Sequence, residues 1–305
     1  MAILVVGSVA FDSVKTPFGK VDDVLGGSAS YFSIAASFFS PVNLVAVVGE
    51  DFPAAHVELF KQFRIDTQGL TRTEGRTFRW AGEYGFSLNE ARTLDTQLNV
   101  FENFRPEIPQ RYSESPYVFL GNIDPVLQRD VLAQVSRPKI VACDTMNYWI
   151  QSKPDELKKT LALVDILIIN DAEARMLTGQ HSLVKAAREI RSWGPKTLVV
   201  KKGEYGVAMF LDGSVFSAPA YPLEDVFDPT GAGDTFAGGF VGYLAKADSL
   251  DEITLRKAII YGSVMASFNV EAFSLERLKR LTAPEIQTRY RAFKELTHFE
   301  PDHLI

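Results

Sequence analysis

The sequence predicts a doubly wound α/β fold, in which helices cover both faces of a mostly parallel sheet. Short runs of apolar, often β-branched residues recur along the chain, and segments with helical spacing lie between them. Such near-continuous apolar runs are typical of strands that are buried on both faces. The clear runs are 2–6, 44–48, 117–120, 140–142, 166–169 and 197–200. Helices are expected at about 27–39, 53–63, 125–135, 154–163, 171–178, 182–192, 231–246 and 251–269.

Composition excludes several classes of protein before any motif is considered. The chain has 305 residues, of which 46% are apolar, so it can bury a large core without disulfides or structural metal. The net charge is −6 and the basic residues are scattered, which argues against a nucleic-acid partner or an anionic membrane surface. A single cysteine, no signal-peptide pattern and no membrane-length apolar run lead us to expect a cytoplasmic protein.

One segment departs from the regular alternation of apolar strands and helices. From about 71 to 104 aromatic and polar residues alternate irregularly, which favours short strands joined by glycine and asparagine turns. A second excursion at about 11–25 could add strands beside it. We therefore expect a small β-sheet, inserted twice, in a single α/β domain that spans residues 1–305.

The most informative stretch is VFDPTGAGDTFAGGF at 226–240. Phe236, Phe240 and Leu244 recur at helical spacing, so a helix begins near the glycines. A helix start preceded by Gly-Ala-Gly offers free N–H groups and the positive end of the dipole to an anion. Asp234 falls in the first turn. It either complements the dipole or acts as a base on a hydroxyl that attacks a phosphoryl group.

Two other nucleotide-binding folds are excluded by spacing. A P-loop needs Lys-Ser or Lys-Thr after its last glycine, and the single Gly-Lys pair, Gly19-Lys20, is followed by Val21. A dinucleotide fingerprint needs Gly-x-Gly-x-x-Gly after the first strand, whereas Gly7 is followed there by Ser-Val-Ala-Phe.

The segment 228–240 resembles the C-terminal signature of the ribokinase-like (PfkB) family of sugar and nucleoside kinases. The resemblance implies a three-layer α/β/α fold with a small β-sheet lid over the sugar site. Four further elements are similar to the family's first strand with its substrate-binding aspartate, its glycine pair, its Asn-x-x-Glu element and its nucleotide-binding turn. They are VGS at 6–8 with Asp12, GGSAS at 26–30, NDAE at 170–173 and KKGEYG at 201–206.

The resemblance implies an ATP-dependent kinase that transfers the γ-phosphate to a hydroxyl of a small sugar. Asp234 would be the general base. The N–H groups of Gly231, Ala232 and Gly233 would hold the charge that develops on the transferred phosphoryl group.

Substrate, nucleotide and metal roles are implied in the same way. The acceptor-binding residues would be Asp12, Gly26, Gly27 and Ser30. Nucleotide and Mg²⁺ would be held by Asn170, Glu173, Lys201, Gly203 and Gly206, the metal largely through waters. A monovalent cation such as K⁺ would lie at Asp228 and Thr230, with the carbonyl groups of Asn269 and Ala272 as further ligands.

The chain departs from the family pattern at two places. Ser30 stands where many sugar kinases carry asparagine, so one contact to a substrate hydroxyl is absent or moved. The segment from Asp144 to Trp149 is only loosely like the Asp-x-Asn-x-Arg element of fructokinase-like relatives, and Trp149 stands near the arginine position. The missing arginine favours a neutral substrate.

Two alternatives to a sugar kinase remain open. A nucleoside kinase of the same family is one, although nothing in the segment 71–104 marks a base pocket. A non-catalytic sugar-binding relative is the other, and an intact Asp234 beside the glycines argues against it. The expected partner is a small-molecule sugar or nucleoside, with the chain as a monomer or homodimer.

Overall fold

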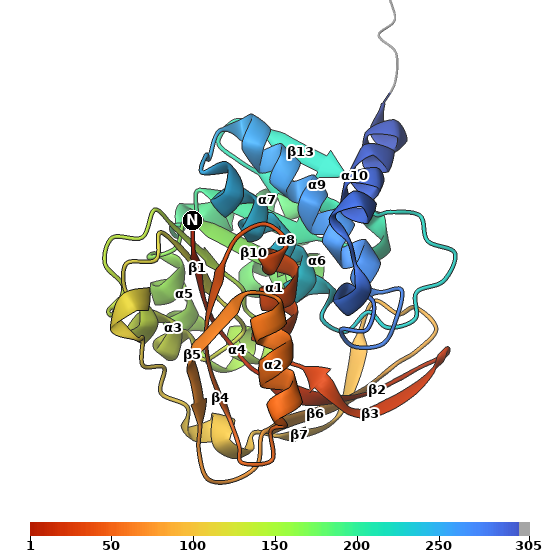
Figure 1. The fold of residues 1–305 in the computed structure, drawn as a ribbon. Helices are drawn as coiled ribbons and strands as arrows, with labels where there is room; N and C mark the ends of the chain where they lie inside the picture. Colours follow the sequence, from red (N-terminus) through yellow and green to blue (C-terminus); the bar gives the residue numbers. More distant parts are fainter. Residues whose placement is uncertain (299–305) are drawn as a thin grey trace, which may run out of the picture.

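The computed structural model describes residues 1–298, and its main sheet is mostly parallel (Figure 1). The strand order is β13-β12-β11-β10-β9-β8-β1-β4-β5, and only β12 and β13 at one edge run antiparallel to their neighbours. The bounds are β1 Ile3–Val6, β4 Val42–Val48, β5 Ile65–Arg72, β8 Tyr117–Leu120, β9 Ile140–Cys143, β10 Ile166–Asn170, β11 Thr197–Lys201, β12 Val207–Phe210 and β13 Val215–Ala218. The predicted fold class is confirmed.

Helices cover both faces of this sheet (Figure 1). They are α1 Ser28–Ser37, α2 Ala54–Gln62, α3 Pro125–Leu132, α4 Asn147–Ser152, α5 Pro154–Leu161, α6 Asp171–Thr178, α7 Leu183–Ser192, α8 Ala232–Ala247, α9 Glu252–Asn269 and α10 Ala283–Thr297. Alternate residues of β1 enter different cores: Ile3 packs with side chains of α1, α8 and α9, and Leu4 with those of α3, α5 and α7. A strand with both faces buried has to be apolar throughout, as the sequence pattern indicated.

A second sheet of four strands, in the order β3-β2-β6-β7, lies beside the main one (Figure 1). Its strands are β2 Ala10–Thr16, β3 Gly19–Gly26, β6 Phe78–Tyr84 and β7 Ala91–Gln97. We call these four strands the small sheet. They come from the two segments in which extra strands were expected, but the second segment contributes less than 71–104. Its first residues end β5 of the main sheet, and Asn99–Asn103 forms a 3₁₀ helix.

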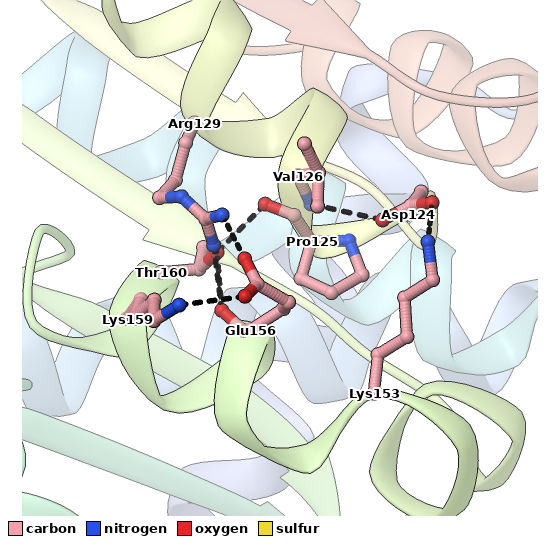
Figure 2. Close-up of polar contacts among 8 residues, drawn as sticks. All are labelled: Asp124, Pro125, Val126, Arg129, Lys153, Glu156, Lys159 and Thr160. Atoms are coloured by element: carbon pink, nitrogen blue, oxygen red, sulfur yellow. Dashed lines mark hydrogen bonds and ion pairs between the residues drawn. The ribbon is translucent and has the colours of Figure 1, made fainter.

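A polar network joins α3 to α5 on one face of the sheet (Figure 2). The Arg129 guanidinium donates to the carbonyl of Glu156 at 2.7 Å and to Thr160 Oγ1 at 3.1 Å, and it also pairs with the Glu156 carboxylate. Asp124 caps α3 by accepting from the Val126 amide at 2.9 Å. The network fixes the two helices relative to each other, because the arginine side chain is largely buried between them.

Within residues 1–298, no helix combines the length and the apolar character that a membrane crossing requires.

Candidate active site

Three polar side chains come together at the carboxyl ends of neighbouring strands. Asp144 follows β9, Asn170 ends β10 and Lys201 ends β11. Lys201 Nζ lies 3.8 Å from Asp144 Oδ2, and the two side chains are only 19% and 8% exposed. Burial alone would lower the pKa of the Lys201 ammonium, but the carboxylates of Asp144, Glu173 and Asp234 outweigh it and raise that pKa. Lys201 is therefore a charged ammonium held among carboxylates.

The start of α8 lies against this lysine. Gly231 precedes the helix with a φ of 71°, and a side chain there would run into the Tyr31 ring. A Cβ on Gly233 would lie 2.7 Å from Lys201 Nζ. The Ala232 amide donates to the carbonyl of Pro229 at 3.1 Å, which differs from its expected role. Within the described chain, the amides of Gly231 and Gly233 have no protein acceptor and remain available to an anion.

Asp234 lies in the first turn of α8 and is partly exposed. Burial and the nearby Asp144 charge raise its pKa to about 7, while Lys201 opposes the rise. A carboxylate whose only role was to complement the helix dipole would have its pKa lowered instead. The environment of Asp234 is thus that of a group that exchanges a proton near neutral pH.

Asn170 and Glu173 form the capping box of α6. The Asn170 amide donates to Glu173 Oε2, and the Glu173 amide donates to Asn170 Oδ1, both at 2.7 Å. Each side chain therefore has a structural role, whatever else it does. Glu173 is buried, and this burial with the Asp144 charge raises its pKa to about 7. A carboxyl with this pKa would be stabilised as the anion by a nearby cation.

Asp12 of β2 lies against the glycine pair that precedes α1. A side chain on Gly26 would collide with its carboxylate, and the Gly27 amide donates a hydrogen bond to it. Burial raises the pKa of Asp12 to about 7, although this hydrogen bond opposes the rise. Ser30 is completely buried, and its hydroxyl has no partner within residues 1–298.

The loop before α8 makes hydrogen bonds to the small sheet. Asp228 is buried and accepts from the amides of Thr230 at 2.9 Å and Ser274 at 3.1 Å. The Thr230 hydroxyl bonds the Tyr84 hydroxyl of β6 at 3.2 Å, and Thr16 Oγ1 of β2 donates to the Phe227 carbonyl at 2.9 Å. The two side chains predicted to hold a monovalent cation therefore have protein partners here.

The small sheet also reaches the predicted nucleotide turn. Gly203 begins a 3₁₀ helix that ends at Tyr205, and Gly206 follows it; their φ angles of 55° and 84° are conformations that favour glycine. Asn89, in the β6–β7 turn, lies directly against Gly203, and its amide donates to Glu204 Oε1 at 3.3 Å. The turn of the small sheet thus lies where a nucleotide is expected to approach the backbone.

Two side chains of the site were missed as site residues. Asp144 had a signal, because it directly follows an apolar run at the carboxyl end of a strand. Tyr31 had none, since the contact that places it joins segments far apart in the sequence. Among the other aromatics of the small sheet, Trp80 folds over Gly82. No cluster of three His, Cys, Asp or Glu side chains arranged for a metal occurs within residues 1–298.

Comparison with known proteins places the chain in one family. The family described as pfkB family carbohydrate kinase matches residues 3–278. The cytidine kinase of Thermococcus kodakarensis is 29% identical over 258 residues, covering 82% of this chain and 91% of the relative. The ribokinase of Haemophilus influenzae is 34% identical over 149 residues, covering 47% of this chain and 44% of the relative.

Solved structures agree on the fold. The nucleoside kinase of Methanocaldococcus jannaschii, described as an archaeal member of the ribokinase family, superposes with a TM-score of 0.77 at 20% identity. That match covers 95% of this chain and 98% of the other. The resemblance read from the sequence is therefore confirmed over nearly the whole chain, which belongs to the pfkB family of carbohydrate kinases.

Proposed function

We propose that this protein transfers the γ-phosphate of ATP to a hydroxyl of a small neutral sugar, with Asp234 as the general base. One observation carries the proposal: a carboxyl with a pKa near 7 lies in the same helical turn as two amides that have no protein acceptor. A proton acceptor beside an anion-binding backbone is what phosphoryl transfer to an alcohol needs.

The transfer balances with these groups alone. The acceptor oxygen forms a bond to the γ-phosphorus, the bond from that phosphorus to the β–γ bridging oxygen breaks, and ADP leaves. Asp234 takes the hydroxyl proton as the acceptor attacks. The amides of Gly231 and Gly233, with the Lys201 ammonium against Gly233, hold the charge on the transferred phosphoryl group.

Mg²⁺ fits the acidic side of the site. Glu173 uses Oε2 in the capping box, and its raised pKa reflects burial beside the Asp144 carboxylate. Glu173 and Asn170 would hold the ion through waters, and a bound Mg²⁺ would neutralise charge on the phosphates. For Asp228 and Thr230 a K⁺ site stays a prediction that their present hydrogen bonds do not support.

A nucleoside is the second candidate acceptor. The T. kodakarensis cytidine kinase aligns over 82% of this chain, whereas the H. influenzae ribokinase aligns over 47%. A solved Burkholderia thailandensis nucleoside kinase in complex with inosine also shares the fold, with a TM-score of 0.75. Both acceptor classes present ribose-type hydroxyls, which Asp12 suits as a hydrogen-bond acceptor.

A substrate screen tests the proposal. The purified protein is incubated with Mg²⁺, ATP and a panel of neutral sugars, polyols, sugar acids, sugar phosphates and nucleosides, and ADP release is followed. Thermal shift with a non-hydrolysable ATP analogue reports binding in parallel. We expect acceptor-dependent ADP release that Asp234→Asn slows by roughly 10²-fold or more. Acceptor binding without phosphorylation by the wild type would instead support the non-catalytic alternative.

A further inference from the structure

Gln128 of α3 is a buried glutamine whose side chain bonds the ends of two strands. The residue is 1% exposed. Its Nε2 donates to the carbonyl of Gly121 at 2.9 Å and to the carbonyl of Asp144 at 3.0 Å, and its Oε1 accepts from Cys143 Sγ at 3.6 Å. The opposite orientation of the amide would set Oε1 against two carbonyl oxygens, so the two donated bonds fix the side chain.

These bonds lie where β8 and β9 part at the carboxyl edge of the main sheet. The last pair in register is Leu120 with Cys143, and the Asp144 amide still donates to the Leu120 carbonyl at 2.9 Å. Beyond this bond the two strands lead to different elements, β8 to α3 and β9 to α4. Gln128 therefore ties the two chain segments together just past the end of their pairing.

The two carbonyls that Gln128 joins belong to opposite sides of the candidate site. A Cβ on Gly121 would lie 3.2 Å from Ser28 Oγ, at the start of α1 and beside the glycine pair that is expected to bind the acceptor. The Asp144 carboxylate lies 3.8 Å from Lys201 Nζ, on the side of the expected nucleotide. One buried side chain thus sets the spacing between the acceptor side and the nucleotide side.

The Asp144 carboxylate follows its own backbone. Its Oδ1 accepts from the next amide, that of Thr145, at 2.7 Å, which fixes the side chain relative to the main chain that carries it. Its charge is among the causes that shift the pKa values of Lys201, Glu173 and Asp234. A displacement of this backbone would therefore move a charge that acts on the ammonium and on both of these carboxyls.

We propose that Gln128 is a positioning residue for phosphoryl transfer: it holds the backbone of Asp144 to the end of β8 and so fixes the ion pair that orients Lys201 toward the start of α8. This inference rests on the proposed function and deepens it. A lysine ammonium sits on a flexible four-carbon chain, so a fixed partner is needed to select one position for it before the phosphates arrive. Gln128 itself touches no reacting atom, because it is buried between α3 and the strand ends.

Gln128→Met tests this role, because methionine has a similar length and no N–H group to donate to the two carbonyls. The single-turnover rate at saturating ATP and acceptor should fall roughly 10- to 100-fold, since a small displacement of a positioned group costs this much. The rates are compared at a pH well above the pKa of Asp234, which is about 7, so that titration of the base does not contribute.

Arg129→Met is the matched control. Arg129 is the next residue of α3 and also loses largely buried hydrogen bonds, but these go to Glu156 and Thr160 of α5 and not to the site. Both variants should melt at a lower temperature than wild type, and the rates are measured well below either melting temperature. Only Gln128→Met should lose rate. A rate for Gln128→Met within twofold of wild type would overturn the inference.

A double-mutant cycle separates this role from general support of the fold. Asp144→Asn removes the carboxylate and should slow the reaction, but it keeps the main-chain carbonyl that accepts from Gln128. In the Asp144→Asn background, Gln128→Met should therefore change the rate less than twofold further. Losses that multiply, or an Asp144→Asn variant as fast as wild type, would show that Gln128 does not act through Asp144 and would overturn the inference.

Gln128→Glu decides the question if the methionine variant does not fold. A buried glutamate is protonated, and its single O–H can serve one carbonyl instead of two, so the rate should still fall several-fold. A rate within twofold of wild type would overturn the inference here as well. A wild type that phosphorylates no acceptor of the panel would overturn the proposed function and this inference together, whereas an active wild type that is insensitive to both substitutions would overturn the inference alone.

Discussion

Asp234→Asn is the substitution that tests the proposed chemistry most directly. Asparagine keeps the size of the side chain and the helix start but cannot accept a proton. We expect the rate of the chemical step to fall by roughly 10²–10⁴-fold, the usual contribution of a general base. Acceptor and nucleotide binding should be nearly unchanged.

The pH dependence follows from the same residue. The pKa of Asp234 is raised to about 7, and only the ionised carboxylate accepts a proton, so kcat/KM should rise with pH across that value. At pH 6 roughly a tenth of the maximal rate should remain for a base with this pKa. Burial is the largest cause of the raised pKa and the Asp144 charge the second, so Asp144→Asn should move the rise to lower pH without restoring the ordinary value of a carboxyl.

The assay is a single-turnover measurement with enzyme in excess of ATP, so that product release does not mask the chemical step. Asp155→Asn is the control, because Asp155 is an exposed carboxylate in the first turn of α5 and serves only the helix dipole. A rate for Asp234→Asn above about a tenth of wild type would refute the assignment of the base. A pH profile that is flat between 6 and 8 would refute the role of its raised pKa.

Three further predictions concern the metal, the small sheet and stability. Glu173→Gln can keep the capping box but loses its charge, so the Mg²⁺ concentration for half-maximal rate should rise. Asp171→Asn, the control, should leave that concentration unchanged. Equal Mg²⁺ dependence in both variants would leave Glu173 a purely structural cap. If the small sheet closes as a lid, amide hydrogen exchange at 78–97 should slow when the acceptor binds and stay constant in β1. High protection at 78–97 without acceptor would show that the small sheet is a rigid insert instead. Arg129→Met should lower the free energy of unfolding, measured in urea, by about 1–2 kcal/mol, because the largely buried hydrogen bonds of the guanidinium to α5 are lost. Lys159→Ala removes an exposed ion pair and should have little effect. Equal losses of stability in the two variants would contradict the burial argument.

Six of the nine strands of the main sheet could be predicted because they follow one physical rule. Each of these central strands is buried on both faces, so its apolar run is visible without any tertiary information. The strands β5, β12 and β13, which lie toward the two edges of the sheet, were not predicted. Two helices that were not predicted, α4 and α10, show no clear apolar periodicity in the sequence. Helix α4 has only six residues, with no side-chain cap. Helix α10 begins with the capping box of Thr282 and Glu285 and a proline in its first turn, which is a readable signal that the helical periodicity did not show.

The residues of the site also fall into two groups, those that a local motif predicts and those that only tertiary contacts place. Asp12, Asn170 and Asp234 were predicted because they belong to local motifs, and the structure places them at the carboxyl edge of the sheet and beside it. The motif did not show that the Ala232 amide is used by Pro229, because that bond depends on the turn geometry. Tyr31 could not be predicted either, since its contact with the site is with Gly231, which lies 200 positions further along the chain.

The charges of the site explain why its two ligands should differ in character. Burial raises the pKa values of Asp12, Glu173 and Asp234 to about 7, so each carboxylate is costly to ionise in the ligand-free protein. Lys201 opposes this for Glu173 and Asp234 but is not among the charges that act on Asp12. On the side of Lys201, the ammonium would face the phosphates of a nucleotide, and the divalent cation that accompanies them would supply positive charge to Glu173. On the side of Asp12, a neutral acceptor whose hydroxyl donates to Asp12 would stabilise the carboxylate without adding charge. The asymmetry supports the proposed arrangement, with the nucleotide on the β10–β11 side and a neutral acceptor on the side of α1 and the small sheet.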